Sequence, residues 1–78
     1  MSEPVTDDPL HGRILAKLDQ LVDEAKPDAK LPYVQMRSIV RGFLTSLCRW
    51  EGSASIAERY SIRAVRRRIA DDLELGER

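Results

Sequence analysis

Cysteine, glycine, proline and aromatic residues are all scarce in this sequence. Among 78 residues there are one cysteine, four glycines, four prolines, one tryptophan, two tyrosines and one phenylalanine. The single cysteine, Cys48, cannot form an internal disulfide, so nothing indicates an oxidising compartment and a cytoplasmic location is expected. Apolar residues make up 42% of the chain and charged residues 33%, a balance typical of a folded domain rather than a disordered segment.

Long hydrophobic runs are absent as well. The longest stretch without a charge is GFLTSLC, residues 42–48, far shorter than the roughly 20 residues that cross a bilayer. The N-terminal MSEPVTDDP is acidic and has no apolar core, so the sequence predicts neither a secretory signal nor a membrane partner. We expect one helical domain over 9–75, a flexible segment over 1–8 and a short tail over 76–78. At this size a second copy often supplies stability, so a homodimer is one expectation.

The first helix is predicted over 9–26. Asp8 is placed to cap it, and Pro9 suits the first helical position because its missing N–H is not needed there. Apolar residues then recur at helical spacing. Pro27 disfavours helix at the residue before it and so ends the segment.

The second helix is predicted from Pro32 to Trp50, with Gly52 ending it. Its apolar residues cover about half of the circumference, which is typical of a helix contacted on two sides, and we expect Trp50 to lie in the core. Near its start, Arg37 and Arg41 are expected to pair with acidic residues at the end of the first helix.

The C-terminal third opens with a capping box, because Ser55 is followed three positions later by Glu58. Two apolar stripes then occupy nearly opposite sides of the segment, so a straight helix would expose one of them. We favour a break near Ser61 that divides the segment into helices over about 56–60 and 62–75. The alternative is one unbroken helix whose second stripe meets a partner chain. One stripe holds Ile56, Ala57, Tyr60 and Ala64, and the other holds Ile62, Val65, Ile69 and Leu73.

These elements predict an all-α fold, a small bundle of three to four helices with a helical hairpin, a short third helix and a basic C-terminal helix. The words IAERYSI and VRRRI in the last part resemble pieces of a helix-turn-helix motif over about fifteen residues. Ala57 would take the packed position of the first helix, and Ile62 would follow the turn. Ser61 stands where common examples have glycine. The resemblance implies a second helix that enters the major groove of DNA.

Charge is unevenly distributed although the formal net charge is zero. Residues 1–30 carry four basic and seven acidic side chains, residues 31–70 carry eight arginines against two glutamates, and residues 71–78 carry one basic and four acidic side chains. Arg67 and Arg68 each have an aspartate four positions later, which neutralises them in part. We assign the binding of a protein partner or nucleic acid to Arg59, Tyr60, Arg63, Arg66 and Arg67.

Little in the sequence indicates catalysis or metal binding. His11 and Cys48 are the only residues of their types, and a thiol-imidazole pair would require the fold to bring them together. Cys48 lies on the apolar face of the second helix, where a buried and inert thiol is usual, and His11 is expected to be exposed. The acidic clusters around Asp7 and Asp71 lack metal-ligand spacing. We therefore expect no catalytic residue, no metal and no cofactor.

Together these features predict a non-enzymatic protein–protein interaction module, a small regulator, inhibitor or accessory subunit of a larger assembly. It would contact its partner through the arginine-rich helical surface, with Tyr60 as the interfacial aromatic residue. The alternative is a DNA-binding transcriptional regulator that uses the same surface, as a dimer, through a helix-turn-helix-like C-terminal half.

Overall fold

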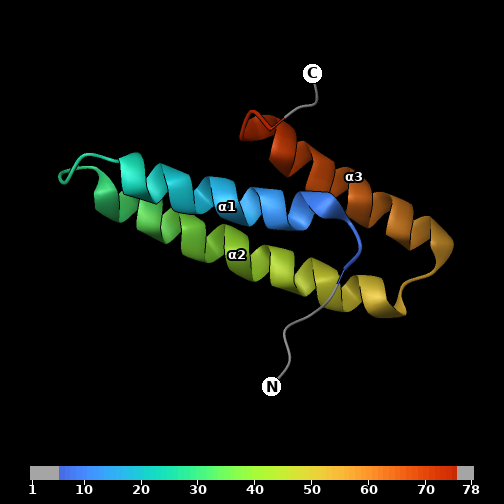
Figure 1. Cartoon of the computed structure of the whole chain (residues 1–78). Coiled ribbons are helices and arrows are strands. Elements are labelled where there is room, and N and C mark those ends of the chain that lie inside the picture. The colour runs from blue at the N-terminus through green and yellow to red at the C-terminus, as the bar shows by residue number, and fades with distance from the viewer. Residues whose placement is uncertain (1–5, 76–78) are drawn as a thin grey trace.

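The computed structural model describes residues 6–75, and within them it contains three α-helices and no strand. α1 spans Pro9–Glu24, α2 spans Lys30–Ser53 and α3 spans Ile56–Asp72. α1 and α2 form an antiparallel hairpin, and α3 returns over the end of the hairpin where α1 begins and α2 ends (Figure 1). Each helix contacts the other two. The predicted all-α bundle is confirmed, with three helices.

The caps of α1 and α3 explain where these two helices begin. Asp8 Oδ1 accepts a hydrogen bond from the Leu10 N–H at 3.0 Å, which satisfies a donor that the first turn leaves free. Before α3, the Ser55 hydroxyl accepts from the Glu58 N–H and the Glu58 carboxylate accepts from the Ser55 N–H. Both caps are confirmed as the sequence predicts.

The ends of α1 and α2 differ from the prediction by two or three residues. α1 ends at Glu24, two residues early, because Ala25 is already extended. α2 begins two residues before Pro32, which is tolerated because the first turn does not use the missing N–H. α2 also passes Gly52 before it ends. Arg37 Nη1 lies 3.0 Å from Asp19 Oδ1 across the hairpin, as predicted, whereas Arg41, for which the same was expected, makes no ion pair with any residue from 6 to 75.

α3 is one uninterrupted helix, so the predicted break near Ser61 is wrong. The Ser61 hydroxyl donates to the Ala57 carbonyl at 3.5 Å, a contact made within a regular helix. The inward stripe is buried at Ile62, which is 0% exposed, whereas Ile56 and Tyr60 on the other stripe are 77% and 74% exposed. The prediction assumed that the chain would bury both stripes. The fold buries Ile62 of the inward stripe fully but leaves Val65 of that stripe 40% exposed, and it leaves Ile56 and Tyr60 of the other stripe on the surface.

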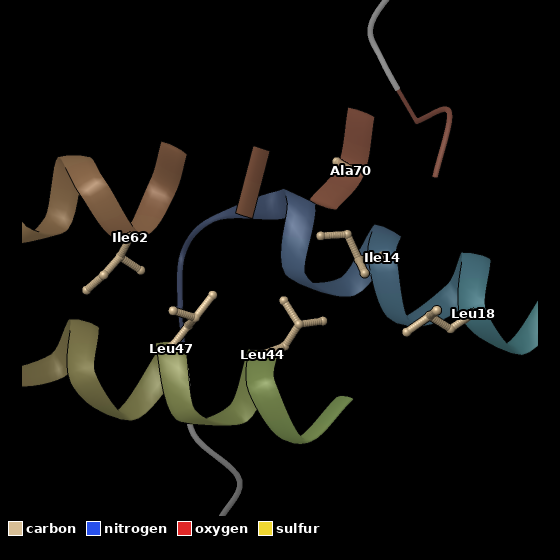
Figure 2. Packing of buried hydrophobic residues seen from close by; sticks show 6 residues of the cluster. All are labelled: Ile14, Leu18, Leu44, Leu47, Ile62 and Ala70. Carbon is tan, nitrogen blue, oxygen red and sulfur yellow. The ribbon is translucent and has the colours of Figure 1, made fainter. Parts of the chain in front are cut away.

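The core lies where the three helices meet, and it is small. Figure 2 shows Leu47 of α2 and Ile62 of α3 pointing toward one another, with Leu44 directed toward Ile14 of α1. The molecule is also thin, since its principal-axis extents are 44 × 35 × 15 Å. A thin molecule encloses little volume, so apolar residues remain on its surface. The buried cluster consists of Ile14, Leu18, Leu44, Leu47, Ile62 and Ala70.

α2 is contacted on two sides, as predicted, but its apolar surface is not fully covered. Trp50, predicted to lie in the core, is 48% exposed. Its indole N–H donates to Glu58 Oε2 of α3 at 3.3 Å, so the ring lies beside the start of α3 rather than beneath it. Among residues 6–75, no helix combines the length and the hydropathy that a bilayer crossing requires.

Replacing the buried isoleucine of α3 should be far more destabilising than replacing the exposed one. We expect Ile62→Ala to lower the free energy of unfolding by about 2–5 kcal/mol, because it leaves a cavity in the core. Ile56→Ala should change it by about 0.5 kcal/mol or less, as surface substitutions usually do. Urea denaturation followed by circular dichroism measures both. Similar losses for the two variants would contradict the assignment of the inward stripe.

Candidate interaction surface on α3

The arginines of α3 lie in three different environments, and Arg66 is the buried one. It is 0% exposed. Its Nη1 lies 2.8 Å from Asp8 Oδ2 and its Nη2 lies 3.0 Å from Glu51 Oε1. The sequence-based assignment of Arg66 to a partner is therefore wrong. That assignment considered acidic residues on the same helix only, whereas the counterions come from the start of α1 and the end of α2.

The buried network joins three parts of the chain that are distant in sequence. Asp8 uses Oδ1 to cap α1 and Oδ2 to bind Arg66. The Thr6 hydroxyl donates to Glu51 Oε1 at 2.8 Å. Burial raises the pKa of the Glu51 carboxyl, but the hydrogen bonds from Arg66 and Thr6, together with the charges of Arg66 and Arg63, outweigh it and leave the pKa below its ordinary value. Glu51 is therefore ionised at neutral pH.

The position of Arg66 carried a signal that sequence reasoning missed. Ile62, Arg66 and Ala70 are spaced by four residues and lie on one line of α3. Since Ile62 and Ala70 are buried, a charged residue between them must be buried as well and needs counterions. Desolvation lowers the pKa of Arg66, but the hydrogen bonds and charges of Glu51 and Asp8 raise it further, so the net shift is upward. The guanidinium remains charged.

The fold also brings together the two residues that the sequence could not place relative to one another. Cys48 Sγ lies 3.4 Å from His11 Nδ1, and His11 is partly buried rather than exposed as expected. Burial raises the pKa of the Cys48 thiol, although Arg66, 3.8 Å from the sulfur, opposes this effect. A buried thiol with a raised pKa is protonated at neutral pH, so it is a poor nucleophile.

Three further arginines of α3 form ion pairs at the surface. Arg63 Nη2 lies 2.8 Å from Asp7 Oδ1, and its Nε lies 3.4 Å from Glu51 Oε2 without the alignment of a hydrogen bond. Arg67 pairs with Asp71 at 3.6 Å and Arg68 with Asp72 at 3.2 Å, as the i,i+4 spacing predicts. The exposed pairs with Asp7, Asp71 and Asp72 each contribute only about 0.2–1 kcal/mol, so these guanidiniums can exchange those partners, whereas the Glu51 side chain that Arg63 also meets is only 9% exposed.

Arg59 is the exception, because its guanidinium makes no hydrogen bond or ion pair with any residue from 6 to 75. The side chains of Arg59 and Arg63 both line two neighbouring hollows on the surface. The polar one, of about 260 Å³, also touches Asp7 and Glu51. The other, of about 220 Å³, is lined by Ile56, Arg59, Tyr60 and Arg63. We call Ile56, Arg59, Tyr60, Arg63 and Arg67 the α3 surface, since they fall within about 100° of the helix circumference.

Of the residues assigned from sequence, the α3 surface keeps Arg59, Tyr60, Arg63 and Arg67, and it adds Ile56. The continuous helix also removes the turn that the helix-turn-helix resemblance requires near Ser61. Of the segment expected to be flexible, residues 1–5 lie outside the described residues, as does the tail 76–78, whereas residues 6–8 contact α2 and α3.

Comparison with family models, curated proteins and solved structures gives no match. Within the described part of the chain, no group of three or more histidine, cysteine, aspartate or glutamate residues is arranged to hold a metal ion.

Removing the buried guanidinium should strongly destabilise the protein. We expect Arg66→Ala to lower the free energy of unfolding by about 3–5 kcal/mol, because it leaves two buried carboxylates without their counterion. Arg67→Ala, one residue along, should cost about 1 kcal/mol or less, since its pair is exposed. Chemical denaturation of the two variants tests the contrast. A nearly neutral Arg66→Ala would show that the network is not formed.

Acid should weaken the fold through Glu51. A carboxyl whose pKa is lower in the folded than in the unfolded state binds fewer protons when folded. Its stabilisation is therefore complete above the unfolded pKa, roughly 4.3, and is lost as the pH falls through the folded value. We expect Glu51→Gln to be less stable at pH 7 but to lose less stability below pH ~4.5. Denaturation midpoints across this range provide the measurement, with the exposed Glu74→Gln as the matched control. A pH profile of Glu51→Gln parallel to that of the unmodified protein would contradict this role.

Proposed function

We propose that the protein is a non-enzymatic protein-interaction module, a small regulator, inhibitor or accessory subunit of a larger assembly, and that it binds its partner through the α3 surface. The observation that carries the proposal is the exposure of Ile56 and Tyr60, both about three-quarters accessible, beside Arg59, which has no counterion within residues 6–75. Isolated exposed apolar residues are ordinary, but an exposed aliphatic and aromatic pair next to an uncompensated guanidinium is typical of a binding hot spot.

The chemistry of this surface favours an acidic partner with apolar side chains. Arg59 can form forked hydrogen bonds with a carboxylate, and the hollow beside it is lined by Ile56 and Tyr60. Arg63 and Arg67 flank the hollow, and their exposed ion pairs are weak enough to yield to an incoming carboxylate. An amphipathic acidic helix offers carboxylates and an apolar residue at matching spacing. We therefore infer that the partner presents such a segment.

Duplex DNA is the competing partner, and the α3 surface offers it less. Arg66 is buried, and Arg63, Arg67 and Arg68 are paired to carboxylates, so Arg59 is the α3 arginine that has no ion pair within residues 6–75. Each phosphate contact adds salt-sensitive affinity, but phosphates leave the exposed Ile56 and Tyr60 uncovered, whereas the apolar side chains of an acidic amphipathic helix cover them.

A synthetic amphipathic peptide tests the proposal. The probe carries glutamate and leucine at helical spacing, and matched peptides replace every glutamate by glutamine or every leucine by serine. We expect fluorescence anisotropy to show binding of the first peptide only. Arg59→Glu should weaken it at least tenfold, which corresponds to about 1.4 kcal/mol. Arg49→Glu makes the same charge change at an exposed site on α2 and should leave affinity unchanged.

Three results would contradict the proposal. The peptide could fail to bind, or bind equally well without its leucines, or lose affinity equally with the two charge-reversal variants. The affinity for a labelled DNA duplex, measured at about 50 and 200 mM salt, tests the competing partner. Tight binding that falls steeply with salt and disappears in Arg59→Glu would replace the acidic segment by nucleic acid.

A further inference from the structure

A second apolar surface lies on α2, and its Trp50 end adjoins the start of α3 through the hydrogen bond to Glu58. Ile39, Phe43 and Trp50 are 73%, 48% and 48% exposed, and their spacing of four and seven residues places them on one line of the helix about 16 Å long. Fully exposed aromatic side chains present about 150–250 Å², so the three residues together expose on the order of 300 Å². That lies at the lower end of the range for the largest apolar patch of an ordinary monomer, about 300–600 Å². We call these residues, with Gly42 and Ser46 beside them, the α2 face.

The α2 face carries no charge. Viewed down the helix axis, an arc of about 120° centred on Ile39 extends from Gly42 on one side to Met36 on the other. All nine residues of α2 in this arc are uncharged: Pro32, Gln35, Met36, Ile39, Gly42, Phe43, Ser46, Trp50 and Ser53. An uncharged apolar face attracts no particular charged partner, and two copies of it meet without repulsion.

The α3 surface differs in this respect. A twofold axis brings each surface residue close to its own counterpart, so self-association there would oppose the arginines at 59, 63 and 67 with those of the other copy. Like charges juxtaposed in an interface are strongly unfavourable. The two surfaces therefore suit different partners because they differ in charge. The α3 surface suits an acidic partner, and the α2 face suits a copy of itself.

Three polar groups of the α2 face have partners within the chain, whereas the Gln35 side chain makes no hydrogen bond with any residue from 6 to 75. The Ser46 hydroxyl donates to the Gly42 carbonyl at 3.2 Å, the Ser53 hydroxyl donates to the Trp50 carbonyl at 3.4 Å, and the Trp50 indole N–H donates to Glu58. Burying these groups would leave none of them without a hydrogen bond, so it avoids the usual penalty for covering polar groups. The part of the α2 face from Ile39 to Ser53 can therefore form a contact that excludes water.

We propose that the protein forms a twofold dimer through the α2 face. The two α2 helices run antiparallel and cross near Phe43 and Ser46, so that Ile39 of one copy packs against Trp50 of the other. Gly42 permits a close crossing because it has no side chain, and no atom of its own chain lies within 4 Å of the position that a Cβ would occupy there. The second copy covers apolar surface that a molecule 15 Å thick cannot enclose by itself.

Two isoleucines provide a matched test of the dimer. Ile39 on α2 and Ile56 on α3 have nearly equal exposure, 73% and 77%. Sedimentation equilibrium of the unmodified chain should show a monomer–dimer equilibrium between about 10 μM and 1 mM, a range that includes weak interfaces. We expect Ile39→Glu to weaken dimerisation at least tenfold and Ile56→Glu to leave it unchanged. Circular dichroism of both variants verifies that each remains folded.

Site-specific cross-linking provides a second readout that does not depend on the folding of Ile39→Glu. In the proposed crossing, Ser46→Cys places two exposed thiols near the twofold axis, and mild oxidation should yield a disulfide-linked dimer. Arg49→Cys, one turn away and off the face, should yield little. A chain that stays monomeric to 1 mM, a dimer lost in Ile56→Glu but kept in Ile39→Glu, or equal cross-linking at both sites would each overturn the proposal. Peptide binding at the α3 surface is measured separately and is unaffected by any of these outcomes.

Discussion

The arrangement of the three helices depends on the two ion pairs of the Arg66 guanidinium. This side chain joins Asp8 at the start of α1 to Glu51 at the end of α2, and it does so inside a protein with few other buried side chains. A buried charge of this kind is tolerated in only one arrangement, because any rotation of α3 would leave the charges unpaired. The network therefore determines which side of α3 faces the core and which side faces solvent.

This orientation of α3 explains both its inward side and its outward side. With Arg66 directed inward, Ile62 and Ala70 above and below it are inward too, and Ile56 and Tyr60 must lie outside. The apolar character of the outer stripe is thus not needed for the core of the single chain. On α2, the line of Ile39, Phe43 and Trp50 is exposed for a different reason, because α1 and α3 cover other sides of that helix. The two surfaces differ in charge, which allows each to have its own partner.

Local features of this fold could be predicted from the sequence, and non-local ones could not. The caps at Asp8 and Ser55, the three helical segments and the pairing of Arg67 with Asp71 depend on residues a few positions apart, and the structure confirms them. The unbroken α3 was the alternative and not the favoured prediction, because two apolar stripes were taken to require two orientations within one chain.

The partners of Arg66 and the proximity of His11 to Cys48 depend on contacts across 15 to 58 positions. Such contacts arise only when tertiary packing is known. Even so, the four-residue spacing of Ile62, Arg66 and Ala70 was visible in the sequence. A charged residue in the middle of a buried line indicates an internal ion pair, and its counterions had to come from another helix because α3 has no acid at the required position.

Trp50 lies where the α2 face meets the start of α3, and it is the one tryptophan of the sequence. Its ring is half exposed on α2 while its indole N–H is hydrogen-bonded to Glu58 near the start of α3. Indole emission shifts to shorter wavelength when the ring leaves water, so the intrinsic fluorescence of the unlabelled protein reports the covering of α2. The molecule thus contains its own optical probe for one of its two surfaces, and the other surface has no tryptophan to obscure the signal.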